Sequence, residues 1–434
     1  MKITVIGCGR LGAPYAAGMA SLGHHVLGLD LNPDTVAALQ AGKAPFAEPG
    51  LAEAITDGAA TGALTFTDSY QHAAAHATVH FLAVPTPQSV DSDHHDLADV
   101  ITAAESLARV LTRDSLIVVK SSVPAGTCAL LARHMTQLTR PGVRVEVAAS
   151  PDFMREGCSI SEVRRPSRIV LGVQPGGGAE QTLRRLWAPC LEAGAPLVVT
   201  DLATAELCKL AANAYLATRI SFVNALAAFC DAAGANVHQL ATVMGHDPRI
   251  GPDYLTPGLG FGGSCLSKDL RGLVALATDL GVGHWLDLLS TADQINQARR
   301  HRAVNLAVEA LGGNPTQQPV AVWGAAFKPG IDDIRDSPAL DVAVQLHQAG
   351  AHVTVYDPQA MPHARAEHPD LDYATDPAAA VDGARVLLHL TAWPQFADLQ
   401  PTTLRPAPHP VLIDARGGLD HKQWTAAGWT VQTL

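Results

Sequence analysis

The feature that most constrains the fold is a glycine-rich turn close to the start of the chain. An apolar run at 2–6 leads into GCGRLG at 7–12, an alanine-rich helical stretch follows, and HHVLGLD at 24–30 has the composition of a strand. This order of strand, glycine turn, helix and strand predicts a βαβ unit. Asp30 ends the second strand 18 residues after Gly12, the spacing at which a carboxylate accepts hydrogen bonds from an adenosine ribose.

We therefore expect a dinucleotide site in which Gly7, Gly9 and Gly12 allow a pyrophosphate to approach the N-terminus of the helix. Asp30 would repel a 2′-phosphate, and the residues at 31–34 include no arginine to hold one, so NAD is favoured over NADP. A tight turn that binds no ligand is the alternative.

Strand and helix signals divide the chain into three parts. Further strands are expected at 79–84, 116–120 and 143–149, separated by helical segments, and this alternation predicts a parallel doubly wound sheet. A long apolar helical region follows from about 201 to 312, and strand and helix alternate again after the linker GGNPTQQP. The predicted fold class is α/β, with two Rossmann-like domains, 1–200 and 313–434, joined by a central helical domain, 201–312.

Composition and charge narrow the possible partners. The chain of 434 residues has a net charge of −11 and no long basic run, which argues against nucleic acid as the main partner. Seven cysteines without a CxxC pair favour free thiols and a reducing compartment. The start MKITVIG has no signal-peptide pattern, and no uninterrupted apolar stretch reaches the length of a membrane span, so we expect a cytoplasmic protein.

The stretch GFGGSCLSKD at 260–269 concentrates reactive residues. Ser264 is a good N-cap for a helix that begins near Cys265, and a thiolate at a helix N-terminus is stabilised by the helix dipole and by the nearby Lys268. Asp269 lies one helical turn after Cys265. The alternative is a small buried thiol. That description suits the other six cysteines better: Cys8, Cys128, Cys158, Cys190, Cys208 and Cys230.

On the long central helix, Lys209 and Asn213 are four residues apart and face the same way. A cation beside an amide is able to stabilise an oxyanion, although the spacing alone favours a chance pair on a solvated helix face. The run DSDHHDLAD at 91–99 resembles a metal site but has no second ligand set, so we expect a solvated loop and no metal.

Several separated motifs, taken in order, resemble the UDP-glucose/GDP-mannose dehydrogenase family over essentially the whole chain. They are the glycine turn with Asp30, EPGL at 48, VPTP at 84, KSSVPAGT at 120, SPDFMREG at 150, KLAAN at 209, RIG at 249, GFGGSCLSKD at 260 and FKPGIDDIRDSP at 327. Arg249 stands 16 residues before Cys265, which is most similar to the UDP-glucose branch.

The resemblance implies a four-electron oxidation of a sugar C6 alcohol to a carboxylate with two NAD+ in succession. Cys265 would attack the intermediate aldehyde to give a thiohemiacetal and then a thioester, which water hydrolyses. Lys209 and Asn213 would hold the C6 oxygen, and Asp269 would order water or Lys209. Asp152 falls where the family has an acid/base glutamate, and Ser122 falls where a threonine is usual.

The same resemblance implies two sets of binding residues. Cofactor contacts would come from Arg10 and Leu11 of the turn, Val84, Pro85, Thr86, Pro87, Ser121, Ser122, Glu156, Lys268 and Arg335. Substrate contacts would come from Asp152, Phe153, Met154, Arg155, Glu156, Lys209, Asn213, Tyr254, Leu255, Gly260, Phe261, Gly262, Phe327, Lys328 and Arg416. Arg249 would reach the sugar of a neighbouring subunit, which implies a homodimer or a higher homo-oligomer.

The departures from the family pattern leave alternatives open. Asp152 is one methylene shorter than the usual glutamate, Ser122 replaces a threonine and Ser267 replaces a proline, and together these changes indicate a divergent member. A different nucleotide such as dTDP, or a GDP-mannose or UDP-N-acetylhexosamine substrate, is therefore an alternative. A two-electron β-hydroxyacid dehydrogenase would share the N-terminal fold but has no use for GFGGSC. A protein that binds NAD or a nucleotide sugar and has lost catalysis is the non-enzymatic alternative.

Overall fold

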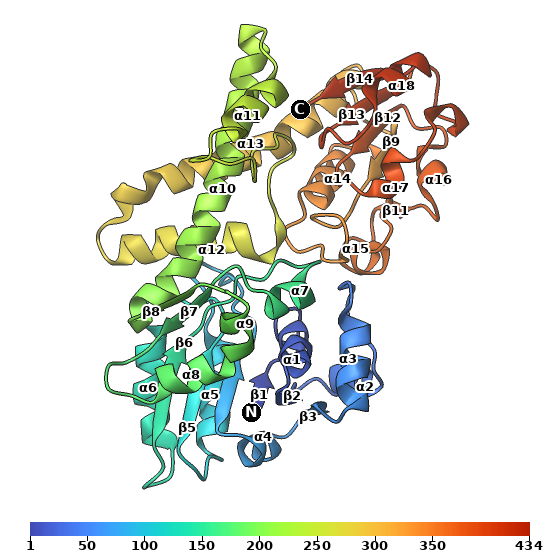
Figure 1. The fold of residues 1–434 in the computed structure, drawn as a ribbon. Helices are drawn as coiled ribbons and strands as arrows, with labels where there is room; N and C mark the ends of the chain where they lie inside the picture. Colours follow the sequence, from blue (N-terminus) through green and yellow to red (C-terminus); the bar gives the residue numbers. More distant parts are fainter. The chain divides into compact units, whose positions relative to one another are not determined.

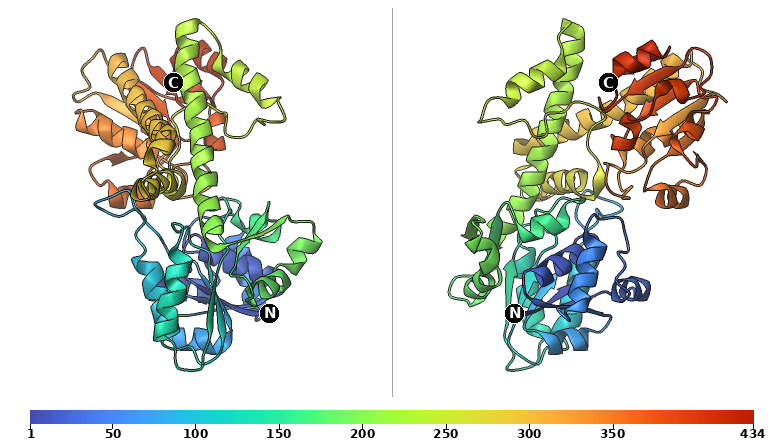
Figure 2. Two further views of the ribbon diagram at one scale, coloured as in Figure 1. Left: turned by 90° about the vertical axis from the view of Figure 1, so that its left-hand side faces the viewer. Right: turned by 45° about the vertical axis from the view of Figure 1, so that its right-hand side comes forward.

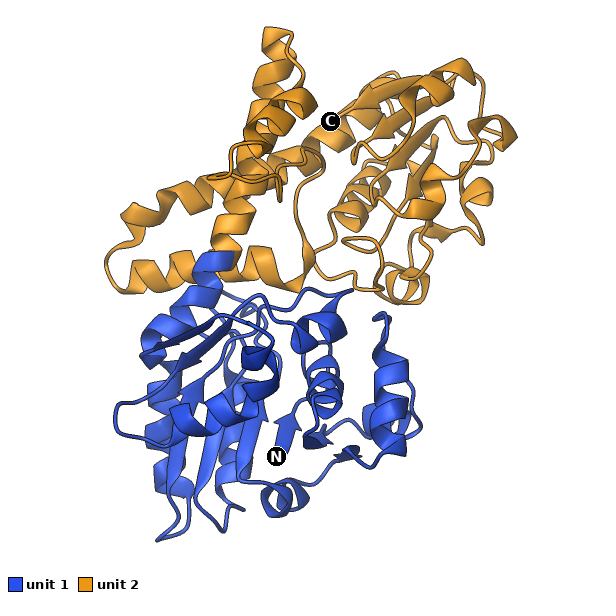
Figure 3. Ribbon diagram, in the orientation of Figure 1, with its two compact units in different colours: residues 1–212 blue, residues 213–434 orange.

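The computed structural model describes residues 1–434, which form two compact units (Figure 3). Unit 1 comprises residues 1–212 and unit 2 comprises residues 213–434. The long helix α10 (Leu202–Ala233) crosses the boundary between them (Figure 1).

Unit 1 is built on an eight-stranded sheet in the order β3-β2-β1-β4-β5-β6-β7-β8. All neighbouring strands are parallel except β6 and β7, which pair antiparallel. The strands are β1 (Lys2–Ile6), β2 (His25–Leu29), β3 (Leu64–Thr67), β4 (Val79–Leu82), β5 (Ser115–Val119), β6 (Val145–Ala149), β7 (Ile169–Gly172) and β8 (Leu197–Thr200).

Helices cover both faces of this sheet (Figure 2). Because side chains alternate along a strand, Ile3 and Val5 of β1 pack into one apolar cluster, and Ile6 packs into the other. Two apolar faces require two helical layers, which is the doubly wound arrangement. The helices are α1 (Gly12–Ser21), α2 (Pro33–Gln40), α3 (Leu51–Ala60), α4 (Tyr70–His76), α5 (Ala98–Ala108), α6 (Thr127–Leu138), α7 (Ser159–Arg164), α8 (Ala179–Leu186) and α9 (Ala188–Glu192).

Unit 2 begins with residues 213–233 of α10 and further helices, and it ends in a six-stranded parallel sheet in the order β11-β10-β9-β12-β13-β14. Its first helices are α11 (Val237–Gly245), α12 (Gly263–Asp279), η1 (Gly283–Leu286) and α13 (Asp287–Ala310). The strands are β9 (Pro319–Trp323), β10 (His352–Tyr356), β11 (Asp372–Tyr373), β12 (Val386–His389), β13 (Val411–Asp414) and β14 (Thr430–Thr433). Between the strands lie α14 (Pro338–Gln348), α15 (Met361–Glu367), α16 (Pro377–Val381), α17 (Pro394–Ala397), η2 (Pro401–Thr403) and α18 (His421–Ala426).

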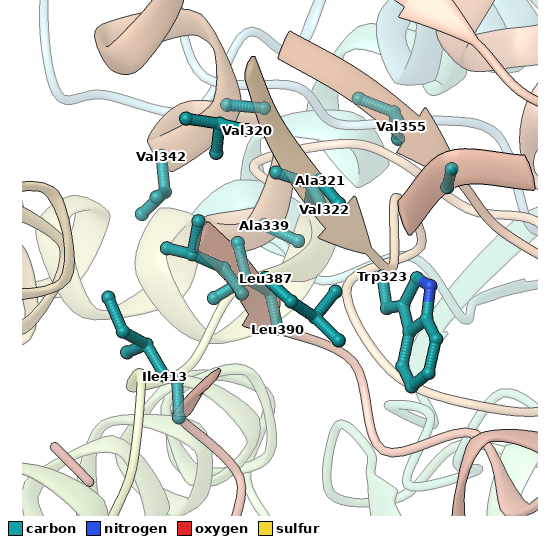
Figure 4. Close-up of a cluster of buried hydrophobic side chains, with 14 of the residues drawn as sticks. Val320, Ala321, Val322, Trp323, Ala339, Val342, Val355, Leu387, Leu390 and Ile413 are labelled. Atoms are coloured by element: carbon teal, nitrogen blue, oxygen red, sulfur yellow. The ribbon is translucent and has the colours of Figure 1, made fainter. Parts of the chain in front are cut away.

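The core of the second sheet centres on β9 (Figure 4). Val320, Ala321, Val322 and Trp323 are all buried, a continuous apolar run of the kind that a central parallel strand requires. The Trp323 ring stacks on Phe396 with 4.9 Å between ring centroids. This packing fixes the carboxyl ends of β9, β12 and β13, from which the loops of unit 2 emerge.

Helix α10 is long and apolar enough to cross a membrane by length and composition, a test that core helices of soluble proteins also pass. Its polar residues are used within the protein. The buried Glu206 accepts hydrogen bonds from the amides of Gly126 (2.7 Å) and Cys128 (2.6 Å) at the start of α6. Arg219 donates to the carbonyls of Ile250 and Gly251, both at 2.8 Å.

The predicted α/β class with two Rossmann-like sheets and a long central helix is confirmed. Five short strands carried no clear sequence signal: β3, β7, β8, β11 and β14. The antiparallel contact of β7 also departs from the wholly parallel sheet that we expected, because the chain returns through the short helix α7 instead of a full crossover.

Candidate active site

The glycine turn joins β1 to α1 and is held by close contacts. A Cβ atom on Gly12 would lie 1.7 Å from the carbonyl oxygen of Gly7, so no larger residue fits there. A Cβ atom on Gly9 would meet nothing within 4 Å, so this part of the turn faces open space. Asp30 follows β2 and accepts the amide hydrogens of Cys8 (2.8 Å) and Asn32 (2.9 Å). The carboxylate therefore lies beside the turn, as a ribose-binding residue must.

Two segments leave the neighbouring strands β4 and β5 at the same edge of the sheet. The Ser121 hydroxyl donates to the carbonyl of Val84 at 2.6 Å, and the Thr86 hydroxyl donates to the carbonyl of Ser122 at 2.8 Å. The order β2-β1-β4-β5 places the switch point between β1 and β4, where open α/β sheets bind their ligands. An open glycine, a helix start and a carboxylate at this crevice fit a dinucleotide.

Other predicted cofactor residues lie near these segments or in unit 2. The Arg10 guanidinium lies 5.0 Å from the centroid of the Phe46 ring, and Leu11 occupies the N-cap position of α1. In unit 2, Arg335 donates to the carboxylate of Asp333 at 2.9 and 3.0 Å, within its own loop.

The segment that follows β6 contains Asp152, which is buried. One carboxylate oxygen accepts the amide hydrogen of Met154 at 3.2 Å, and the other lies 3.5 Å from the Lys120 ammonium. The next residue, Phe153, packs between two cations. The Arg168 guanidinium lies 3.7 Å from its ring centroid and the Lys209 ammonium 5.7 Å from it.

The end of the same segment is fixed by Glu48 of the EPGL motif. Its buried carboxylate accepts the amide hydrogens of Gly157 (2.8 Å) and Ser159 (2.9 Å), where α7 begins. Arg155 pairs with Glu162 through contacts of 2.6 Å. The motif that the sequence singled out without a role therefore anchors the predicted substrate loop.

Lys209 and Asn213 are both buried and lie one turn apart on α10. In unit 2, the Asn213 amide donates to one oxygen of Asp269 at 2.7 Å, and the Lys268 ammonium lies 2.6 Å from the other oxygen. The fully buried Asp269 thus joins Asn213 to the helix that carries the cysteine. Sequence spacing placed Asp269 near Cys265 but did not predict its bond to Asn213.

Helix α12 begins at Gly263, with the extended Gly262 as its N-cap and no side-chain cap. The prediction that Ser264 caps this helix is wrong, because the N-cap is the extended Gly262, two residues earlier, and Ser264 lies inside the first turn. Cys265 lies exposed in that first turn, where the helix dipole favours an anion. Cys158 is also exposed, so the prediction that it is a buried small residue is wrong.

We call the segment 258–263, which leads into α12 and Cys265, the cysteine loop. Polar side chains of α13 that the sequence analysis did not identify hold this loop by hydrogen bonds. Asn296 accepts the amide hydrogen of Phe261 at 2.8 Å and donates back to its carbonyl at 3.0 Å. Arg299 donates to the carbonyl of Gly258 at 3.0 Å, and Arg300 donates to that of Phe261 at 3.1 Å. All three are buried and stand at i, i+3 and i+4, a polar face that could have been recognised in NQARR.

Two glycines of this loop are required by its packing against neighbouring side chains, because a Cβ atom at either position would collide with them. A Cβ on Gly260 would lie 2.1 Å from the Asn296 amide oxygen, and one on Gly263 would lie 2.7 Å from the Phe327 ring. Both have positive φ, 96° and 85°. Phe327 is therefore brought to the start of α12, and Lys328 lies 5.6 Å from its ring centroid.

The remaining predicted substrate residues lie in separate loops of unit 2. Arg416 donates to the carbonyls of Leu390 (2.7 Å) and Gly260 (2.9 Å), which ties it to the cysteine loop. Tyr254 has a positive φ of 62°, and Leu255 is buried. Arg249 is exposed, with its guanidinium 2.6 Å from the Asp247 carboxylate.

Comparison with known proteins gives matches along the whole chain. Three domain models of the UDP-glucose/GDP-mannose dehydrogenase family match: the NAD binding domain at 1–191, the central domain at 203–298 and the UDP binding domain at 321–421. The UDP-glucose 6-dehydrogenase of Rhizobium meliloti (strain 1021) is 39% identical over 96% of this chain and 95% of its own length. UDP-glucose 6-dehydrogenase YwqF of Bacillus subtilis (strain 168) is 35% identical over 99% of this chain and 96% of its own length.

A solved UDP-glucose dehydrogenase from the hyperthermophilic archaeon Pyrobaculum islandicum has a similar structure. It superposes with a TM-score of 0.91 at 35% identity, covering 99% of this chain and 98% of that one.

Proposed function

Because this chain belongs to the UDP-glucose/GDP-mannose dehydrogenase family, we propose that it oxidises C6 of UDP-glucose from an alcohol to a carboxylate. It is an NAD-dependent oxidoreductase with a nucleotide-sugar substrate. The observation that carries the specific reaction is Cys265, an exposed thiol in the first turn of α12, held on a helix that Asp269 joins to Asn213. A two-electron dehydrogenase has no need of this thiol.

NAD+, when bound, accepts a hydride from the sugar carbon, and the four-electron reaction consumes two NAD+ in succession. The glycine turn would hold its pyrophosphate, and Asp30 would bind the ribose hydroxyls because its carboxylate lies beside the turn. The further cofactor residues in the proposal are Arg10, Leu11, Val84, Pro85, Thr86, Pro87, Ser121, Ser122, Glu156, Lys268 and Arg335.

Lys209 and Asn213 would bind the C6 oxygen as negative charge develops on it. They stand one turn apart on one helix, which supports a site where the ammonium and the amide would reach one atom from the same side. Asp269 would orient this site, because its hydrogen bond fixes the Asn213 amide.

Cys265 would add to the aldehyde carbon, because an aldehyde becomes a good hydride donor only after a nucleophile has added. Loss of the second hydride leaves a thioester on the sulfur. In hydrolysis, the oxygen of a water molecule bonds to the carbonyl carbon, the carbon–sulfur bond breaks, and the products are the sugar acid and the free thiol. Asp152 would take a proton from that water, with Ser122 as a neighbouring hydroxyl.

The sugar nucleotide would be bound by basic and main-chain groups from several loops. The proposed residues are Asp152, Phe153, Met154, Arg155, Glu156, Tyr254, Leu255, Gly260, Phe261, Gly262, Phe327, Lys328 and Arg416. Arg249 would contact the sugar of a neighbouring subunit, and its exposure leaves it accessible to a partner. We propose that the protein is a homodimer or a higher homo-oligomer and that it works in the cytoplasm. We also propose three functional domains, 1–200, 201–312 and 313–434.

The test is a panel of UDP-, dTDP- and GDP-sugars with NAD+, scored by NADH yield and by acid product. We expect about two NADH for each UDP-glucose consumed, together with UDP-glucuronate. One NADH per sugar would indicate a two-electron dehydrogenase, and none would indicate a binding protein. A higher kcat/KM for a GDP- or N-acetylated sugar would overturn the substrate assignment.

A further inference from the structure

Unit 1 contains a cavity next to Asp152, which we name the Tyr15 cavity. It is lined by Tyr15 of α1, Lys120 after β5, the segment 150–154, the segment 166–170 and Trp187 after α8. Its volume is about 40 Å³. A site that holds one water molecule needs about 10–15 Å³ of such volume, so the cavity has room for water.

Three polar atoms on the walls of this cavity are buried and have no hydrogen-bond partner in the protein. They are the Tyr15 hydroxyl, the Trp187 indole nitrogen and one carboxylate oxygen of Asp152. The exposed fractions of these residues are 0%, 3% and 9%. A buried polar group without a hydrogen bond destabilises the folded protein, so these atoms on one cavity point to a polar ligand. Because they comprise two donors and an acceptor, the ligand must both accept and donate, as water does.

Four charged residues line the cavity: Lys120, Asp152, Glu162 and Arg168. Lys120 and Asp152 form a buried ion pair. The Lys120 ammonium lies 3.5 Å from this oxygen of Asp152, 3.4 Å from the carbonyl of Ser150 and 4.7 Å from the centroid of the Tyr15 ring. Burial lowers the pKa of Lys120, and the Asp152 carboxylate opposes that shift. Burial and the same carboxylate raise the pKa of Tyr15, so the phenol keeps its proton and stays a donor.

We propose that the Tyr15 cavity is a water site that positions Asp152, with Tyr15, Trp187 and Lys120 as positioning residues for its carboxylate. The inference rests on the proposed function, in which Asp152 takes a proton from the hydrolytic water. Water held by the phenol and the indole donates to the inner oxygen of Asp152, and Lys120 neutralises the charge from the same side. The carboxylate is then held in one orientation before the thioester arrives.

The structural test needs no activity. A high-resolution crystal structure of the full chain should show ordered water within hydrogen-bond distance of the Tyr15 hydroxyl and the Asp152 carboxylate. If the three polar atoms are instead bonded to repacked protein groups and the cavity is closed, the proposal is wrong.

The kinetic test compares two variants with a matched control. Tyr15→Phe removes only the hydroxyl and keeps the ring beside Lys120, and Trp187→Phe removes the indole donor. Tyr373→Phe is the control, because its hydroxyl donates to the carbonyls of Ala364 (2.7 Å) and His368 (2.8 Å) and Tyr373 does not line this cavity. Rapid-quench NADH measurements and the mass of the enzyme report the steps separately.

For Tyr15→Phe we expect a burst of about two NADH per site at the parent rate, followed by turnover about 10-fold slower, with the thioester accumulating on Cys265. Trp187→Phe should behave in the same way, and Tyr373→Phe should match the parent. Equal slowing of the burst and of turnover, or no slowing in either cavity variant, would overturn the positioning role. If the parent makes no NADH from any nucleotide sugar, the proposed function fails, while the crystallographic water still decides on the site.

Discussion

Replacing Asp269 with asparagine should destabilise unit 2, because it leaves a buried cation without its counter-ion. The Asp269 side chain is 0% exposed, and the Lys268 ammonium, whose side chain is 15% exposed, lies 2.6 Å from it. The other carboxylate oxygen accepts from Asn213 at 2.7 Å. An asparagine has the same shape but removes the charge.

The magnitude follows from this geometry. Two unit charges 2.6 Å apart attract by about 6 kcal/mol at an effective dielectric constant of about 20. Desolvation of both groups offsets much of this, and removal of one partner from a buried pair costs about 3–5 kcal/mol. Because Lys268 retains some contact with water, we expect Asp269→Asn to lower the free energy of unfolding by about 3 kcal/mol.

Urea unfolding monitored by tryptophan fluorescence measures this change, since Trp285, Trp323, Trp393, Trp424 and Trp429 all belong to unit 2. The double variant Lys268→Met with Asp269→Asn is the matched control. Because this double variant also removes the Lys268 ammonium, its free energy of unfolding should be about 1–2 kcal/mol higher than that of Asp269→Asn. A loss below about 1 kcal/mol for Asp269→Asn, or a double variant less stable than the single, would refute the reasoning.

Three further predictions concern the thiol, the glycine turn and the acid stability of unit 2. Cys265→Ser should lower acid formation by about 10⁴-fold, measured by product chromatography, and a near-parent rate would exclude the thioester. Gly12→Ala, whose Cβ would lie 1.7 Å from a main-chain oxygen, should cost more than about 4 kcal/mol in thermal unfolding. Gly9→Ala, which meets open space, should keep the fold and weaken NAD binding in calorimetry; equal unfolding of both would contradict this. Burial raises the pKa of Asp414, but its hydrogen bond to His389 at 2.8 Å and the charge of that ring outweigh burial and hold the pKa well below the usual range. Its stabilising contribution is therefore present above about pH 4 and is lost as the pH falls, so Asp414→Asn should flatten the decline in urea midpoint below about pH 4. An unchanged slope would show that another carboxylate is responsible.

Local patterns in the sequence were sufficient to predict the positions of the residues proposed to bind the dinucleotide. The glycine turn, the helix start and Asp30 are close in sequence, and their geometry depends on one βαβ unit whose backbone rules are general. The long helix α10 and the alternation of unit 2 are equally local signals, because periodicity and length distinguish helix from strand. Short strands such as β7 and β8 have only four residues each and lack such a signal.

The helix start at the cysteine loop shows where local rules failed. Ser264 has the composition of an N-cap, but the cap position belongs to Gly262 because the loop packs against Asn296 and Phe327. The requirement for glycine at 260 and 263 has the same origin. Sequence spacing identified the residues of this loop, and contacts with α13 and with the segment around 327 decided its conformation.

By itself, the sequence determined the fold class and the cofactor preference, and it identified Cys265 as the proposed nucleophile, because each depends on residue types at short fixed spacings. Only the tertiary structure decided which polar and charged side chains pair with each other and which buried polar atoms have no hydrogen-bond partner in the protein. Asn213 bonds to Asp269 from a distant helix, and Asp152 faces Lys120 beside the Tyr15 cavity. The physical reason is that hydrogen bonding and desolvation depend on what surrounds a group in space, which the spacing of residues along the chain does not specify.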